Sequence, residues 1–454
     1  MVLEIRWCAV ARGDKRRPVA SEPSSSAVAT DGFVDEPARR TRVHARTEVL
    51  VVGGGAAGVA AAVAAARNGA ATVLVERGGA LGGLATGGLI ILLLTLDDGA
   101  GHQVIGGVCE EIVERLRARG AAYDPPAAEW GATDDALVER DRRFGLVWGS
   151  APHRVRYSVA YDPEEMRFAL SNLCEEAGVR LLFHSLACEG IRDGDRMRGV
   201  AFQGKSGRFA ILADVVIDAT GDGDVFSSVG VPFELEKVLP WLWLRMGGVA
   251  DVEGALDRGG ALFRTVADGQ VLLPWGATER IVAKIDATDP EDLTRAELQC
   301  RRKVMEAVDE LRRERPEMAR AHVCEIARDL GITESRRLVG DVVLGRDDID
   351  RRRDDAIALT GHWTRYGALY WIPYGSLLAP GVENLLVAGR CISVDHRVHH
   401  ATKEIPACMA TGQAAGTAAA MAVRKGTAPR GLALDDVRGR LLAQGAILDL
   451  DRTA

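Results

Sequence analysis

A histidine-rich stretch near the C-terminal end contains the side chains best suited to acid–base chemistry. In the run GRCISVDHRVHHATKEIPAC, His396, His399, His400 and Lys403 follow one another closely. A histidine titrates near neutral pH and can transfer a proton, whereas a lysine ammonium can bind a carboxylate. Three close histidines also suggest a metal site, but no nearby acid or cysteine completes a convincing ligand spacing. The stretch therefore offers groups for proton transfer and anion binding, and we expect no metal.

A second motif contributes glycines in place of reactive side chains. The run EVLVVGGGAAGVAAAVAAARNG places Gly53, Gly55 and Gly58 in the pattern G-x-G-x-x-G, between an aliphatic strand at 49–52 and a helix at 56–68. In such a motif the first glycine permits a tight turn, the second lets the backbone approach a pyrophosphate, and the third lets the helix pack closely on the strand. The N–H groups and the dipole of the helix then face the phosphates.

An acidic residue completes this motif. TVLVE forms the next expected strand and ends at Glu76, about 20 residues beyond the glycines, where a carboxylate can accept hydrogen bonds from a ribose diol. The strand, turn, helix and acid together predict a dinucleotide-binding unit that includes Ala57 and Arg77. The glycine pattern alone does not separate NAD from FAD.

A second glycine cluster distinguishes these two cofactors. RGGALGGLATGG follows Glu76 directly. It resembles the glycine-rich turn of FAD-dependent oxidoreductases of the glutathione-reductase-like superfamily, specifically the family related to fumarate reductase flavoproteins. In that family the turn passes the FAD pyrophosphate and reaches the isoalloxazine ring. The resemblance therefore implies FAD, and it places Gly82, Gly83, Ala85 and Thr86 beside the cofactor.

Further segments match the same family in the same order. DATGDGDVFSSVG resembles its turn towards the cofactor, and TESRR resembles its return to the FAD domain. NLLVAGR and the small-residue helix PACMATGQAAGTAAAMA follow, and the N-terminus of that helix is expected to face flavin N1 and O2. The residues that this resemblance adds to the FAD site are Ala187, Gly221, Asp222, Gly389, Arg390, Met409 and Gly412.

The resemblance also gives roles to the histidine-rich stretch, which passes the flavin in that family. His396 and Lys403 fall where family members commonly carry a histidine and an arginine. We therefore expect His396 to transfer a proton, and Lys403 to bind a substrate carboxylate or to stabilise reduced flavin. A lysine in place of arginine argues against bidentate carboxylate binding. His399 and His400 are unusual neighbours and are expected to contact this protein's own substrate.

Other reactive residue types favour packing. Cys391 and Cys408 belong to no CxxC pair and are expected to be small apolar fillers. YWIPYG resembles over a few residues a motif of flavin-dependent halogenases, but the upstream glycine–tryptophan is missing. We interpret it as a strand on the substrate side, in which Tyr370 and Tyr374 contact either substrate or the core.

The composition of the chain excludes several classes of protein. Its 454 residues are 47% hydrophobic and 27% charged, as in ordinary globular proteins, and the net charge of −7 gives no global basic field for nucleic acid. The longest apolar run, LATGGLIILLLTL, is too short to span a membrane. Scattered cysteines and the lack of a signal-peptide pattern favour a cytoplasmic protein.

These observations predict an α/β protein with a discontinuous Rossmann-like FAD-binding domain and an inserted mixed α+β substrate domain. The expected segments are a disordered tail at 1–46, the FAD-binding domain at 47–87, 160–229 and 336–430, the substrate domain at 88–159 and 230–335, and a C-terminal helix and tail at 431–454.

The expected function is hydride transfer between a small organic substrate and FAD, as in a dehydrogenase or an oxidase. An ene-reductase or desaturase is an alternative, because the kinship with fumarate reductase allows it. A flavin-binding electron-relay subunit of a complex is another. The sequence leaves open the substrate, the partner that recycles the flavin, covalent attachment of FAD, and whether the protein is a monomer or a homo-oligomer.

Overall fold

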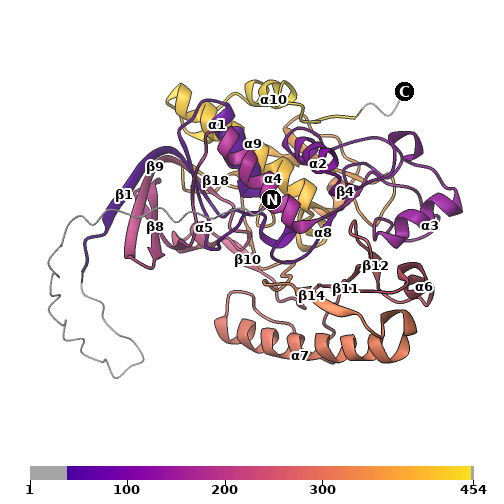
Figure 1. The fold of residues 1–454 in the computed structure, drawn as a ribbon. Helices are drawn as coiled ribbons and strands as arrows, with labels where there is room; N and C mark the ends of the chain where they lie inside the picture. The colour runs from indigo at the N-terminus through magenta and orange to yellow at the C-terminus, as the bar shows by residue number, and fades with distance from the viewer. Residues whose placement is uncertain (1–37, 451–454) are drawn as a thin grey trace, which may run out of the picture. The chain divides into compact units, whose positions relative to one another are not determined.

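The first strand begins earlier than its apolar pattern indicates. The computed structural model describes residues 38–450, and β1 runs from Arg42 to Val52 (Figure 1). The prediction of a disordered tail up to residue 46 is therefore wrong for residues 42–46, while residues 1–37 lie outside the described part of the chain. This first half of β1 is mostly exposed but pairs in parallel with β9 (Gly207–Asp218), so backbone hydrogen bonds hold a segment that carries no hydrophobic signal.

A seven-stranded sheet forms the centre of the fold. Its parallel part pairs β1 with β2 and β9, β2 with β6, and β9 with β18, whereas β7 and β8 continue from β9 as antiparallel strands. The remaining strands of this sheet are β2 (Thr72–Val75), β6 (Arg180–Leu182), β7 (Leu186–Asp193), β8 (Arg196–Gly204) and β18 (Leu385–Val387). The continuous aliphatic runs of β1 and β2 are buried, as expected for parallel strands covered on both faces. The predicted α/β class is confirmed.

Two small-residue helices cross on this sheet. They are α1 (Ala56–Arg67) and α9 (Ile405–Lys425). A Cβ atom added to Gly412 would lie 2.1 Å from the carbonyl oxygen of Ala57, and one added to Gly416 would lie 2.0 Å from that of Ala61. The two backbones therefore touch directly, which explains why both helices are so rich in alanine and glycine.

The first inserted piece lies between β2 and β6. It contains a three-stranded antiparallel sheet and two amphipathic helices: β3 (Leu92–Leu93), β4 (Ala122–Tyr123), β5 (Val159–Tyr161), α2 (Val108–Ala118) and α3 (Asp135–Arg143). Helix α4 (Pro163–Glu176) follows β5, and its N-cap is Asp162, which accepts hydrogen bonds from the N–H groups of Glu164 and Glu165.

The second inserted piece is a four-stranded antiparallel sheet with the long helix α7. Its elements are β11 (Leu244–Gly247), α6 (Val252–Asp257), β12 (Phe263–Arg264), β13 (Val271–Leu273), α7 (Pro290–Glu314) and β14 (His322–Ile326). Arg312 of α7 donates to the carbonyl of Ala321 and Arg301 to that of Ala327, so α7 is tied to both ends of β14 (Figure 1).

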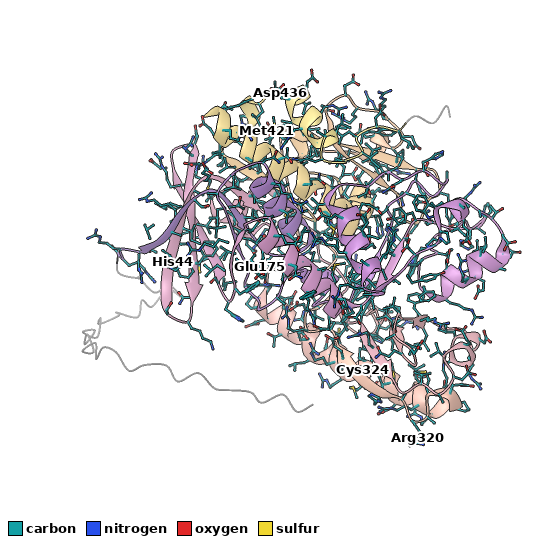
Figure 2. All side chains as sticks on the ribbon, turned by 45° about the horizontal axis from the view of Figure 1, so that its top comes forward. His44, Glu175, Arg320, Cys324, Met421 and Asp436 are labelled. Atoms are coloured by element: carbon teal, nitrogen blue, oxygen red, sulfur yellow. The ribbon has the colours of Figure 1, made fainter. Side chains whose placement is uncertain are left out.

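The remaining elements include two separate two-stranded sheets, β10 (Phe233–Leu235) with β15 (Arg336–Leu338) and β16 (Ala356–Gly361) with β17 (Leu369–Pro373). The others are α5 (Asp224–Ser228), α8 (His396–Thr402) and α10 (Leu434–Leu442). Helix α10 lies against α9, where Lys425 forms an ion pair with Asp436, which Figure 2 labels. From Arg42 onward these elements form one compact unit, and its division into FAD-binding and substrate segments stays a prediction. No helix within residues 38–450 combines the length and the apolar character needed to cross a membrane.

Candidate active site

A cavity of about 840 Å³ opens at the carboxyl ends of the parallel strands. Its wall includes Gly53 after β1, Glu76 after β2, Gly221 after β9 and Gly389 after β18. In open α/β sheets this edge is where ligands bind. The inserted pieces close the cavity with tryptophans and a short segment after β14, namely Trp148, Trp241, Trp243, Arg328, Asp329, Leu330, Ile332 and Thr333. Trp363, between β16 and β17, also lines the cavity.

The first glycine motif forms a cradle at the N-terminus of α1. Gly53 has φ +102°, and a Cβ there would lie 2.4 Å from the carbonyl oxygen of Ala219; a Cβ on Gly58 would lie 1.8 Å from that of Gly53. At Gly55, the N-cap of α1, an added Cβ would meet no heavy atom within 4 Å. No side chain caps this helix, so its first N–H groups and its dipole are available to an anion.

Glu76 is fixed at one end of the cavity by two backbone donors. Its Oε2 accepts a hydrogen bond from Gly54 N–H at 2.7 Å, and its Oε1 accepts one from Gly78 N–H at 2.6 Å. An ionised carboxylate has further lone pairs and can still accept from a diol. Arg77 also lines this end.

Ala187 does not line the cavity, contrary to the expectation that it contacts adenine. It lies on β7, which leads away into the β7–β8 hairpin. His184, three positions earlier, faces the cavity instead, with φ +55° and its N–H bonded to the carbonyl of Gly78. Its position in a tight connection before β7 gave no periodic signal that sequence reasoning could use.

The second glycine motif forms another part of the wall. Gly82, Gly83 and Ala85 line the cavity. Thr86 does not: it is buried, and its hydroxyl donates to the carbonyl of Leu81 at 2.7 Å. It therefore holds the turn in place rather than contacting a ligand.

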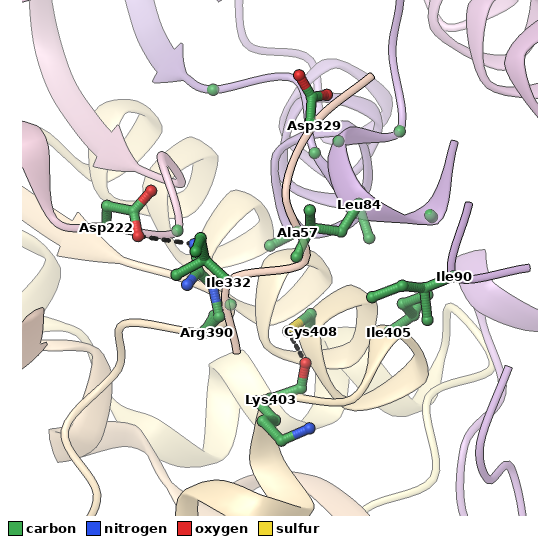
Figure 3. A pocket seen from close by; sticks show the side chains of 18 of the residues that line it. Ala57, Leu84, Ile90, Asp222, Asp329, Ile332, Arg390, Lys403, Ile405 and Cys408 are labelled. Carbon is green, nitrogen blue, oxygen red and sulfur yellow. Dashed lines mark hydrogen bonds and ion pairs between the residues drawn. The ribbon is translucent and has the colours of Figure 1, made fainter. Parts of the chain in front are cut away.

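A charged pair crosses the middle of the cavity wall. Arg390 Nη2 lies 2.8 Å from Asp222 Oδ1, which also accepts a hydrogen bond from Ser335 Oγ at 2.5 Å (Figure 3). The turn that carries Asp222 is fixed by Asp218, which is buried and accepts from Thr220 and from the N–H groups of Val225 and Phe226.

The N-terminal turn of α9 closes the wall beyond Arg390. Ile405 and Cys408 line the cavity there, and Cys408 Sγ donates to the carbonyl of Lys403 at 3.2 Å (Figure 3). Burial raises the pKa of the Cys408 thiol to about 12, so this side chain stays a neutral filler. Met409 and Gly412, expected at the cofactor, are fully buried in the core and at the α1–α9 crossing.

Most of the histidine-rich stretch folds into helix α8, and this separates its side chains. His400 and Lys403 line the cavity, whereas His396 and His399 do not. His396 lies in the first turn of α8, with a side chain 59% exposed and Nδ1 2.8 Å from Glu334 Oε2. His399 is buried, with Nε2 2.9 Å from the carbonyl oxygen of Arg390. His396, which was expected to transfer a proton, therefore does not line the cavity in this structure.

The end of the cavity beside α8 combines charge with aromatic surface. Lys403 Nζ lies 2.7 Å from Glu404 Oε1 and 5.9 Å from the ring centroid of Trp363, whose Nε1 donates to the carbonyl of His400 at 2.9 Å. Trp148 packs edge-on against Trp363 with ring centroids 5.5 Å apart. Burial and the charge of Lys403 lower the pKa of His400, while Glu404 partly opposes them, so the imidazole is neutral at neutral pH.

Comparison with known proteins identifies the family. The sequence model described as "FAD dependent oxidoreductase" matches residues 48–441. The chain belongs to this family. FAD is therefore its cofactor and the protein is an oxidoreductase, while the expected kinship with fumarate reductase flavoproteins stays a prediction.

Solved structures related to this oxidoreductase are distant. A geranylgeranyl bacteriochlorophyll reductase-like protein of Thermoplasma acidophilum is 14% identical, with TM-score 0.46 over 88% of this chain and 84% of that one. A p-nitrophenol 4-monooxygenase of Pseudomonas putida DLL-E4 is 13% identical, with TM-score 0.49 over 90% and 91%. An L-proline dehydrogenase of P. horikoshii is 12% identical, with TM-score 0.44 over 88% and 98%. A search of curated protein sequences finds no match.

The residues of the cavity fit the cofactor of this FAD dependent oxidoreductase family. The uncapped N-terminus of α1 suits a pyrophosphate, and Glu76 suits a ribose diol. The volume of about 840 Å³ falls within the range of ligand sites. Across residues 38–450, no group of three or more histidine, cysteine or acidic side chains is arranged to hold a metal ion.

Proposed function

We propose that this FAD-dependent oxidoreductase is a dehydrogenase or oxidase that removes a hydride equivalent from a small organic substrate. The observation that carries the proposal is that a single cavity joins the glycine cradle at Gly53–Gly55 to a wall holding His400, Lys403 and Glu404. Bound FAD supplies a hydride acceptor, and the protein has to place the substrate and handle one proton.

The fixed positions of the cradle and of Glu76 support one orientation of FAD. Glu76 would hold the adenosine ribose and the N-terminus of α1 the pyrophosphate, which leaves the flavin ring for the wall made by Gly389, Arg390 and α9. There the dipole of α9 favours negative charge on the ring. Gly82 and Gly83, which also line the cavity, would lie beside the part of FAD that joins the adenosine to the flavin.

His400 is the residue that we assign to proton transfer. Its lowered pKa keeps the imidazole unprotonated at neutral pH and therefore able to accept a proton. His396 pairs with Glu334 away from the cavity and is not assigned this role. Lys403 and Glu404 would position the substrate, and Ile90, Leu94 and Trp148 would exclude water around it.

Two alternatives use the same cavity differently. An ene-reductase or desaturase would act at a carbon–carbon double bond, and an electron-relay subunit would need no small substrate. We favour a small substrate because His400, Lys403 and Glu404 gather on the wall beside Trp363, and an electron relay has no use for such a group of side chains. The cysteines within residues 38–450 are free thiols, and we propose a reducing compartment such as the cytoplasm.

Anaerobic flavin bleaching tests this function. The purified holoprotein is mixed with a panel of small amines, amino acids, alcohols, hydroxy acids and saturated carboxylic acids, and flavin absorbance is followed, with dithionite as the control for full reduction. The proposal predicts bleaching by at least one amine, amino acid, alcohol or hydroxy acid. Bleaching only by saturated acids would favour a desaturase, and bleaching only by dithionite or a protein fraction would favour the relay.

A further inference from the structure

The wall of the cavity contains an ion pair between Lys403 and Glu404 that is not needed for the stability of the fold. Lys403 and Glu404 are adjacent in the chain at the junction of α8 and α9, with Nζ and Oε1 2.7 Å apart. Their side chains are only 15% and 13% exposed, and both line the cavity. A largely buried ion pair contributes little net stability, because desolvation offsets the attraction between the charges. Its place on the wall therefore points to a ligand.

The surroundings of this pair are apolar and aromatic. Ile90, Leu94 and Ile405 also line the cavity, and Ile405 follows the pair directly in the chain (Figure 3). Trp148 and Trp363 form the aromatic part of the wall, packed edge to face. Charges in such surroundings are weakly screened, so a ligand must offer a matching charge to each of them.

The charges of the pair select against ligands that carry a single charge. An anion at Lys403 would lie next to the Glu404 carboxylate, and a cation at Glu404 would lie next to the Lys403 ammonium. Each would be repelled by one member of the pair. Arg390 and Asp222 form another ion pair on the wall and together carry no net charge, so they favour neither a cation nor an anion. The complementary ligand carries an ammonium and a carboxylate close together.

We propose that the substrate is an α-amino acid, or its N-alkyl relative, with an apolar or aromatic side chain. Its ammonium would bind Glu404, its carboxylate would bind Lys403, and its side chain would pack on Trp148 and Trp363. This inference rests on the proposed function and names the substrate class for it. A zwitterionic substrate needs one positive and one negative partner close together, and the adjacent Lys403 and Glu404 provide both.

Oxidation of an amino acid releases one hydride and one proton, and the site has an acceptor for each. Loss of a hydride from Cα and of one proton from the ammonium turns the C–N single bond into the double bond of an iminium. The bound FAD is the hydride acceptor, and His400 accepts the proton as a neutral imidazole. No further oxidant or reductant is needed for this half of the reaction.

A binding experiment with the holoprotein tests the inference without relying on turnover. The L- and D-forms of leucine, phenylalanine, tryptophan and proline are titrated anaerobically, with heat and the flavin spectrum as readouts. For the best binder, two relatives follow: the acid without the amino group and the amine without the carboxylate. Wild-type protein should bind the amino acid at least about tenfold more tightly than either relative, in the range measured for buried charge pairs.

Variants of Lys403 and Glu404 should change the preference among the three ligands in different ways. Glu404→Gln should weaken amino-acid binding about tenfold and strengthen binding of the acid, because the repelling carboxylate is gone. Lys403→Gln should weaken amino-acid binding and strengthen binding of the amine. Glu404→Asp keeps the charge and should keep the preference. Lys425→Gln, in an exposed ion pair with Asp436 away from the cavity, is the matched control and should change nothing.

Three results would overturn the inference. The first is that no amino acid of the panel binds, the second is that a singly charged relative binds as tightly as the amino acid, and the third is that both variants shift all three ligands equally. Bleaching of the flavin by an alcohol or hydroxy acid, together with any of these results, would leave the proposed hydride transfer standing. Failure of every small molecule to bleach the flavin would instead remove the proposed function.

Discussion

The contacts of His396, His399 and His400 decide which of these three histidines can take part in chemistry. His400 and Trp363 are linked through the carbonyl of His400, and this places the imidazole at the cavity wall beside Lys403. His399 is used to hold the carbonyl of Arg390, and His396 pairs with Glu334 near the surface. Residue type is the same at all three positions, and only the contacts of α8 distinguish them.

This difference predicts that alanine substitutions of His400 and His396 affect the rate of flavin reduction differently. His400→Ala should slow flavin reduction by substrate at least about tenfold, because general acid–base catalysis contributes this much or more. His396→Ala, on the same short helix, should leave the rate within a factor of two or so of wild type, since its partner Glu334 lies outside the cavity. Rapid-mixing absorbance under anaerobic conditions measures both.

The pH profile of wild-type protein is the control for this role. Because the pKa of His400 is lowered, the reduction rate should hold as pH falls through the ordinary histidine range near 6.5 and should drop only at lower pH. Equal slowing in both alanine variants, or a rate that rises as the pH falls, would contradict the assignment to His400.

The crossing of helices α1 and α9 limits which side chains can be introduced near the glycine turn at Gly53–Gly55. The α1–α9 crossing brings backbone against backbone at Gly412, directly beneath the turn that carries Gly55. Any side chain at this position has to push the helices apart. The N-terminal turns of α1 and α9 both line the cavity, so such a shift also reaches the cofactor.

Matched glycine substitutions test this crossing. Gly412→Ala should lower the free energy of unfolding by about 1–3 kcal/mol through overpacking, and should weaken FAD binding. Gly439→Ala on α10 meets no heavy atom within 4 Å and should raise the free energy of unfolding by up to about 1 kcal/mol. Urea unfolding and FAD titration measure the two effects. Similar stability of the two variants would mean that the crossing is looser than described.

Helices and strands with a local cause were predictable from the sequence. The unit β1–α1–β2 follows the predicted glycine pattern. The starts of α4 and α7 also carry a local signal, since their N-caps Asp162 and Asp289 each precede a proline. The exposed half of β1 was missed because it depends on pairing with β9. Sequence periodicity contains no information about such a partner. The helix at 396–402 was also missed: Asp395 is a local N-cap signal, but the helix is only seven residues long and has no long apolar period.

The whole molecule brings the site together from distant parts of the chain. The glycine turns, Glu76, Asp222, Arg390 and Lys403 were predicted from motifs and line one cavity. The tryptophans of the inserted pieces and the segment around Asp329 were not predicted, because each lies in a region without a motif and reaches the cavity only through long-range packing. Asp329 N–H donates to the carbonyl of Gly87, which ties this inserted segment to the second glycine turn.

The most direct test of this arrangement is a crystal structure of the protein with FAD bound. We predict that the pyrophosphate lies at the N-terminus of α1 and that the flavin ring lies against Gly389 and α9. His400, Lys403 and Glu404 should then face the remaining open space. A ring at the Glu76 end of the cavity, or one that fills the corner beside Trp363 and leaves no room for a substrate, would contradict the proposed site.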